Sequence, residues 1–155
     1  MKKYEQISKN CKIMWKPGFD LTTEKYTQVS GYIFNENDEL LIVKTKDNWT
    51  IPGGHPELYE YTLGTLIREV MEEACVSIKN IKYLGAVEVV ENKEKYYQLR
   101  YLARVKEIHD FKEEWEVSER KFVKLEDLKK YISWSDGVTF QEQLESAKNS
   151  MGRKK

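Results

Sequence analysis

One helical segment constrains the fold of this chain more than any other feature. The sequence TLGTLIREVMEEA, residues 62–74, has apolar residues at the spacing of one helix face, namely Leu63, Leu66, Ile67, Val70 and Ala74. Three acidic residues, Glu69, Glu72 and Glu73, gather toward its C-terminal end. The segment therefore predicts an amphipathic helix with one side against a core and a cluster of carboxylates on the other side.

Helix stability alone does not account for this acidic cluster. Glu69 and Glu73 are four residues apart, and like charges at that spacing destabilise a helix by about 0.2–0.5 kcal/mol per pair. Carboxylates near a helix C-terminus are also unfavourable. The stretch from Asp47 to Ile78 contains no lysine and has six acids against one base. A bound Mg²⁺ or Mn²⁺ would explain such a cluster, because these cations prefer carboxylate oxygens; the alternative is a solvated acidic face.

Composition excludes several classes of protein. The 155 residues carry 26 basic and 26 acidic side chains, and this zero net charge argues against an electrostatic nucleic-acid binder. No apolar run approaches the length of a membrane span or of a signal peptide. The two cysteines, Cys11 and Cys75, form neither a disulfide framework nor a C-x-x-C metal pair. We therefore expect a cytoplasmic protein with no membrane association and no nucleic-acid partner.

The remaining pattern predicts a mixed α/β (α+β) fold. No repeat or linker divides the chain, so we expect one domain over residues 1–150 and a disordered tail over 151–155. Residues 1–25 are mixed and have no clear pattern. The expected strands are 26–34 and 39–45, joined as a hairpin, a short strand before a Pro/Gly loop at NWTIPGGHPE, then 81–91 and 95–108 around a turn at Asn92, and 119–125. The expected helices besides 62–74 are 126–132 and 138–151.

The surroundings of the acidic helix carry a longer motif. From Gly54 the chain reads GHPELYEYTLGTLIREVMEEACV, residues 54–76. This resembles the signature of the Nudix hydrolase family, G-x5-E-x7-R-E-U-x-E-E-x-G-U, where U is apolar. Within that family the sequence looks most like the MutT-type proteins. The departure is Cys75, which stands where the family has Gly. A residue other than Gly in a left-handed conformation after a helix costs about 1 kcal/mol, so Cys75 affects stability more than chemistry.

The resemblance implies a fold and a set of site residues. The expected fold is an α/β/α sandwich with a mixed β-sheet between helices. The implied metal ligands, for Mg²⁺ or Mn²⁺, are Glu69, Glu73, Glu72 and the backbone carbonyl of Gly53. Glu69 and Glu72 are also implied in catalysis, and Arg68 and Glu60 are implied as an ion pair that orients Glu69. The implied general base is a glutamate of the Nudix signature at residues 54–76, called the box below, or a later acid, Glu116 or Glu119. The weaker substrate-binding candidates are Gly54, His55, Arg100 and Tyr97.

The implied activity is metal-dependent cleavage of a pyrophosphate bond in a nucleoside diphosphate-linked compound. A nucleoside or deoxynucleoside triphosphate is the first choice of substrate. The alternatives are a dinucleoside polyphosphate, a nucleotide sugar or ADP-ribose, and a non-catalytic nucleotide-sensing domain of the same fold. The partner is then a small nucleotide, and a homodimer is among the assemblies that the family adopts.

Overall fold

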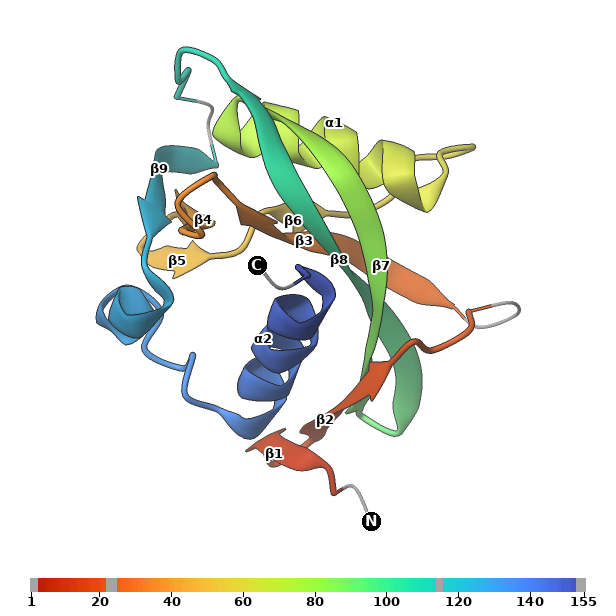
Figure 1. Ribbon diagram of the computed structural model, residues 1–155. Coiled ribbons are helices and arrows are strands. Elements are labelled where there is room, and N and C mark those ends of the chain that lie inside the picture. Colours follow the sequence, from red (N-terminus) through yellow and green to blue (C-terminus); the bar gives the residue numbers. More distant parts are fainter. Residues whose placement is uncertain (1–2, 22–24, 114–115, 153–155) are drawn as a thin grey trace.

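Two helices lie on opposite faces of one mixed β-sheet. The computed structural model describes residues 3–21, 25–113 and 116–152. Helix α1 (Thr62–Ala74) covers one face of the sheet and helix α2 (Val138–Ser150) covers the other (Figure 1). The predicted α/β/α sandwich is therefore confirmed. None of the helices in these ranges is long and apolar enough to cross a membrane.

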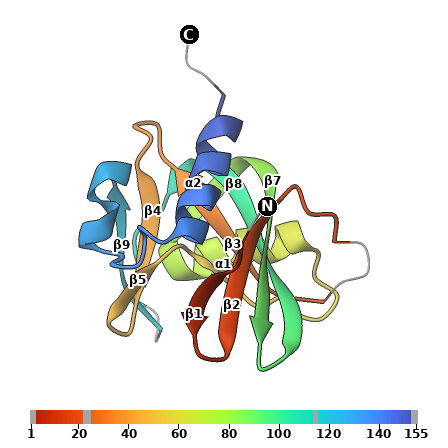
Figure 2. The same cartoon turned by 90° about the horizontal axis from the view of Figure 1, so that it is seen from below.

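Nine strands form the sheet in the described part of the chain. They are β1 (Glu5–Ser8), β2 (Cys11–Pro17), β3 (Tyr26–Phe34), β4 (Leu40–Thr45), β5 (Asn48–Thr50), β6 (Gly53–Gly54), β7 (Val76–Glu91), β8 (Glu94–Ile108) and β9 (Val117–Val123). The order is β1-β2-β7-β8-β3-β4-β5, while β6 pairs with β3 and β9 pairs with β4. Only β3 and β8 run parallel among the pairings described. Figure 2 shows β1 and β2 beside the long β7–β8 hairpin.

Side chains alternate along β3, so that the strand contributes to two separate cores. Val29 and Ile33 pack with Leu66 and Val70 of α1. Tyr32 and Phe34, on the other face, pack with Phe140 and Leu144 of α2. The apolar side of α1 is narrower than its spacing predicts, because Leu63 and Ile67 are each 46% exposed. The sheet thus separates an α1 side from an α2 side, and the same strands serve both.

The predicted hairpin of residues 26–34 and 39–45 is confirmed as an antiparallel connection, but its paired region is short. A turn does join β3 to β4, but the two strands pair only at Phe34 and Leu40. Earlier along β3 the same edge pairs with β6, through Val29 with Gly54 and Ser30 with Gly53. Because the Pro/Gly loop occupies that edge, β4 diverges and pairs with β9 instead.

Other boundaries also differ from the sequence prediction. Residues 1–25, which had no clear pattern, contain β1 and β2. The predicted helix 126–132 is a 3₁₀ helix, η1 (Leu125–Lys130), and the strand expected at 119–125 lies two residues earlier. The turn at Asn92 is confirmed: Asn92 and Lys93 both have positive φ, which is typical of a two-residue hairpin turn. The predicted tail 151–155 lies mostly outside the described residues.

Cys75 ends α1 in the left-handed conformation, with φ 56° and ψ 42°. This is the conformation that the usual Gly would adopt, and the chain enters β7 at once, five residues before the predicted start of that strand. Arg120 Nη1 donates to the Ala74 carbonyl at 2.7 Å and to the Cys75 carbonyl at 3.3 Å. A cation from β9 therefore satisfies the end of α1, close to the acidic cluster.

Candidate active site

Arg68 links the acidic residues of α1 to the loop that precedes the helix. Its Nε and Nη2 donate to the two oxygens of Glu60 at 2.8 and 3.0 Å, a bidentate ion pair. Its Nη1 donates to Glu69 Oε1 at 2.7 Å and to Glu72 Oε2 at 3.2 Å. Its Nη2 also donates to the His55 carbonyl at 3.0 Å. The predicted pair of Arg68 and Glu60 is confirmed, and it holds the loop against the helix.

Arg68 partly compensates the acidic cluster, which has no lysine near it in the sequence. It lies four residues before Glu72 and contacts it directly. It contacts Glu69 as well, so part of the like-charge repulsion is offset. The Arg68 contacts that the structure describes include no ion pair with Glu73, the third acid of the cluster.

The two glycines of β6 bring the backbone against the carboxylates. The Gly53 N–H donates to Glu73 Oε1 at 2.7 Å. A Cβ on Gly54 would lie 2.4 Å from Glu69 Cδ, and a Cβ on Gly53 would lie 2.2 Å from Ser30 Oγ. Neither space accepts a side chain. The loop and the helix therefore fit together only because both positions are Gly.

Burial and neighbouring charges shift the pKa values of these glutamates in different directions. Burial, reinforced by Glu69, Glu116 and Glu72, raises the pKa of Glu73 from 4.5 to about 7, although the Gly53 N–H opposes the shift. Burial also raises the pKa of Glu69, against the effect of Arg68. The hydrogen bonds from Arg68 lower the pKa of Glu60 to about 2. Glu60 is thus a fixed anion, whereas the site around Glu73 already resists further negative charge.

The donor chemistry of this cluster fits a hard divalent cation. Glu69, Glu72 and Glu73 supply carboxylate oxygens, and a positive charge among them would offset the repulsion from neighbouring acids that adds to burial in raising the pKa of Glu73. In the conformation described, no three acidic, histidine or cysteine side chains of residues 3–21, 25–113 and 116–152 converge as metal ligands. Glu69 instead contacts Arg68, and Glu73 contacts Gly53. Binding a cation would therefore require these two carboxylates to turn. The Gly53 carbonyl stays a predicted ligand.

The two candidates for a later general base lie in different surroundings. Glu116 precedes β9, is exposed, and is close enough to Glu73 to raise its pKa. Glu119 Oε2 lies 3.4 Å from Lys44 Nζ in a surface ion pair. The structure thus brings Glu116, more than Glu119, to the acidic cluster.

The weaker substrate-binding candidates are not all in one place. The ring of exposed His55 lies next to Gly54, and its Nδ1 donates to the Thr27 carbonyl at 2.6 Å. Tyr97 is buried on the α1 side of the sheet, where its ring stacks on Phe19 at 4.6 Å. Arg100 lies on the α2 side, in a cavity of about 560 Å³.

This cavity lies between the sheet and α2 and reaches the Gly53 loop. Thr50 and Ile51, just before the loop, line it, as does Ser30, which pairs with Gly53. The aromatic rings of Tyr32, Tyr96, Trp134 and Phe140 line it too. Sequence reasoning found neither Ser30 nor the glutamines around Arg100, because no local motif marks them.

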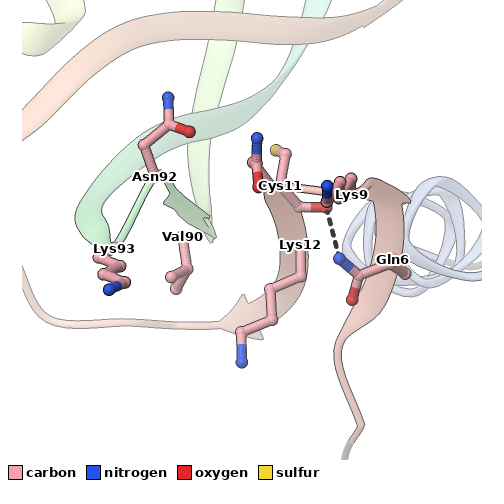
Figure 3. A pocket seen from close by; sticks show the side chains of 8 residues that line it. Gln6, Lys9, Cys11, Lys12, Val90, Asn92 and Lys93 are labelled. Carbon is pink, nitrogen blue, oxygen red and sulfur yellow. Dashed lines mark hydrogen bonds between the residues drawn. The ribbon is translucent and has the colours of Figure 1, made fainter.

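A second hollow, of about 550 Å³, lies between the β1–β2 and β7–β8 turns (Figure 3). Its lining includes Lys9, Lys12 and Lys93 and shares Cys11 with the cavity under α2. None of the box residues 54–76 lines it.

The NUDIX domain model matches residues 25–143, which is most of the chain. The chain belongs to the NUDIX domain family. The predicted Nudix hydrolase is thus confirmed at the level of the family, whose members generally use divalent metals.

Curated relatives point to phosphohydrolases. Diphosphoinositol polyphosphate phosphohydrolase 2 from Mus musculus is 36% identical over 105 residues, and the protein of the same name from Homo sapiens gives the same identity. Each match covers 63% of this chain and 56% of the relative. The chain therefore spans little more than half the length of these relatives.

Solved structures show the same Nudix fold. The pyrophosphohydrolase BsRppH of Bacillus subtilis superposes with a TM-score of 0.81 at 18% identity, covering 96% of this chain and 98% of that one. The Ap4A hydrolase of C. elegans superposes with a TM-score of 0.58 at 20% identity, covering 79% of this chain and 98% of that one. At these identities the likeness concerns the fold alone.

Proposed function

We propose that this Nudix protein is a metal-dependent pyrophosphohydrolase that cleaves a phosphoanhydride bond of a nucleotide, with a nucleoside or deoxynucleoside triphosphate as the first choice. The observation that carries the proposal is the junction at Gly53. Its N–H donates to Glu73 of α1 on one face of the sheet, and its strand partner Ser30 lines a cavity of about 560 Å³ on the other face, which is large enough for a nucleoside. A substrate with its phosphates at the box and its base in the cavity would use both features.

The residues of the box have distinct parts in this proposal. A divalent cation held by Glu69, Glu73 and Glu72 would neutralise phosphate charge and make a bound water more acidic. Glu60 fixes Arg68, and Arg68 in turn orients Glu69. The Gly53 N–H holds Glu73 against the Pro/Gly loop. Glu116 is the candidate that takes the proton of the attacking water, because it is close enough to Glu73 for its negative charge to raise the pKa of Glu73.

The lining of the cavity supports a nucleotide over an inositol polyphosphate. Four aromatic rings line it, and such rings stack on a nucleobase. Its charged lining residues are Arg100 and Glu5, whereas a ligand with many phosphates needs several cations.

A diphosphoinositol polyphosphate is the second candidate. Its support is the 36% identity with phosphohydrolases of that name and the three lysines of the hollow in Figure 3.

A substrate panel tests the proposal. The panel contains nucleoside triphosphates, a dinucleoside tetraphosphate, ADP-ribose and a diphosphoinositol polyphosphate, each with Mg²⁺ and with chelator. We expect Mg²⁺-dependent turnover with the highest kcat/KM on a nucleoside triphosphate. A higher kcat/KM on the diphosphoinositol compound would favour the second candidate, and no turnover of any compound would contradict both.

A further inference from the structure

Arg100 lines the cavity and lies two strands away from the Gly53 loop. Gly53 of β6 pairs with Ser30 of β3, and Ser30 pairs with Arg100 of β8, so the three residues form one row across the sheet. Neighbouring strands are about 4.8 Å apart, which places the backbone of Arg100 about 10 Å from that of Gly53. Ser30 and Arg100 both line the cavity.

Three glutamines surround the guanidinium. Nε donates to Gln143 Oε1 at 3.1 Å, Nη1 to Gln28 Oε1 at 3.1 Å, and Nη2 to Gln98 Oε1 at 3.2 Å. Nη1 also donates to the Leu99 carbonyl at 3.2 Å. Gln143 Oε1 also accepts from the Tyr32 hydroxyl at 2.7 Å. Among the hydrogen bonds that the structure describes, the amide nitrogens of Gln28 and Gln98 and one hydrogen of Nη2 have no acceptor, so N–H donors remain beside the guanidinium.

The guanidinium has no carboxylate partner among the residues that the structure describes. Glu5 lines the same cavity, but its Oε1 accepts from the Thr139 N–H at 2.8 Å, at the start of α2. Burial lowers the pKa of Arg100, which is the effect of a low-dielectric setting without a counter-ion. A cation kept in such a place is stabilised when an electron-rich group of a ligand reaches it.

A cluster of donors selects against ligands that present donors. Arg has five N–H groups and no acceptor, so it binds a carbonyl oxygen and repels an amino group. A guanine or hypoxanthine base has a carbonyl at C6, where adenine has an amino group. The row position also favours the base over a phosphate, because phosphates held at Gly53 lie two strands away from Arg100. Trp134 and Phe140 supply rings in the same cavity.

We propose that Arg100, held by Gln28, Gln98 and Gln143, selects nucleotides whose purine carries an oxo group at C6 over adenine nucleotides. This inference rests on the proposed function, since it assigns the base of the substrate whose phosphates bind the Nudix box. Arg100 acts here as a specificity-determining residue and not as a catalytic one.

The unmodified protein gives the first test. We expect kcat/KM for GTP and for ITP to exceed that for ATP by about tenfold or more, the discrimination of one charged hydrogen bond against a misplaced amino group. ITP lacks the 2-amino group of GTP, so a shared preference identifies the 6-oxo group as the feature recognised. Equal kcat/KM for the three, or a preference for ATP, would overturn the proposal.

A matched pair of variants gives the second test. Arg100→Gln removes the guanidinium, while Arg104→Gln removes one from the same strand whose Nη1 pairs with Asp38 Oδ1 at 2.6 Å outside the cavity. We expect Arg100→Gln to lower kcat/KM for GTP about tenfold or more, mainly through KM, and to change the value for ATP less than threefold. Arg104→Gln should change neither. An equal loss on GTP and ATP in Arg100→Gln would contradict the proposal.

Equilibrium binding of GDP and ADP to the metal-free protein separates this inference from the proposed function. Tighter binding of GDP than ADP without hydrolysis of any nucleotide would support the role of Arg100 and contradict the proposed activity. Hydrolysis of nucleotides with no 6-oxo preference would do the reverse. If Arg100→Gln does not fold, as judged by its thermal midpoint, the comparison of GTP, ITP and ATP on the unmodified protein decides alone.

Discussion

The Gly53 N–H donates to Glu73 Oε1 at 2.7 Å, and this bond joins the Pro/Gly loop to the C-terminal half of α1. The Glu73 carboxylate is partly buried beside other acids, with one neutral donor and no cation of its own among the described ion pairs. A metal ion at this position would relieve the repulsion.

Metal binding is the first consequence. We expect Mg²⁺ or Mn²⁺ to raise the thermal midpoint of the unmodified protein, because a ligand that binds only the folded state stabilises it. Glu73→Gln keeps an acceptor for the Gly53 N–H but removes the charge, and should abolish most of this rise. Glu145→Gln, an exposed acid on α2, is the control and should keep it. An equal rise in Glu73→Gln would contradict the assignment of Glu73 as a ligand.

The raised pKa of Glu73 predicts how stability depends on pH in chelator. The folded pKa is about 7 and the ordinary value is 4.5, so the folded state holds the proton more tightly. The stabilisation is complete below pH 4.5 and is lost as the pH rises toward and through 7. The urea midpoint of the unmodified protein should fall between pH 5 and pH 8 more than that of Glu73→Gln. Parallel curves for the two proteins would contradict this origin of the shift.

Gly54 is required by the position of the Glu69 carboxylate. A Cβ there would lie 2.4 Å from Glu69 Cδ, so Gly54→Ala must displace the carboxylate. We expect kcat/KM to fall about tenfold to a hundredfold, the range seen when groups that orient metal ligands are lost. Gly64→Ala, in α1, is the control. Its new Cβ would lie 3.5 Å from Glu60 Cγ, so this variant should keep its activity. It should gain up to about 1 kcal/mol of stability. Full activity in Gly54→Ala would refute the steric argument.

The Arg68–Glu60 pair predicts a difference between two neighbouring glutamates. Glu60 accepts two hydrogen bonds from Arg68, whereas Glu57 Oε1 lies 3.7 Å from Arg68 Nη1 and is 68% exposed. Glu60→Gln should lower kcat by about tenfold or more by freeing Arg68 and Glu69. Glu57→Gln should have little effect, as expected of an exposed pair. Steady-state kinetics on both variants checks this, and equal effects would contradict it.

Cys75 carries the cost of its left-handed conformation. Cys75→Ala and Cys75→Gly both remove the thiol, but only Gly adopts φ 56° without strain. Denaturant unfolding should show Cys75→Gly to be more stable than Cys75→Ala by about 1 kcal/mol. Activity should be the same in both, since Cys75 contacts the backbone of Lys112 and not the carboxylates. A lower stability of Cys75→Gly would mean that the left-handed conformation carries no cost.

The features that the sequence predicted are local in the chain. The helix 62–74 follows from its apolar spacing, and the Arg68–Glu60 pair follows from a motif within one loop and one helix. The sequence predicted the β3–β4 hairpin but not its short paired region, because β6 occupies the edge of β3 and this pairing joins residues distant in the sequence. The surroundings of Arg100 could not be predicted for the same reason. Gln28, Gln98 and Gln143 come from β3, β8 and α2, and each looks like an ordinary polar residue in its own segment.

Metal-dependent hydrolysis at the acidic cluster is tested most directly by the turnover of a nucleoside triphosphate. The unmodified protein, Glu73→Gln and Glu145→Gln are each assayed with Mg²⁺ and with chelator. We expect turnover by the unmodified protein and by Glu145→Gln with Mg²⁺ only. We also expect a loss of at least a hundredfold in Glu73→Gln, because a carboxylate proposed to hold the metal is removed. Turnover that persists in chelator, or that Glu73→Gln leaves unchanged, would contradict a metal-dependent reaction at this site.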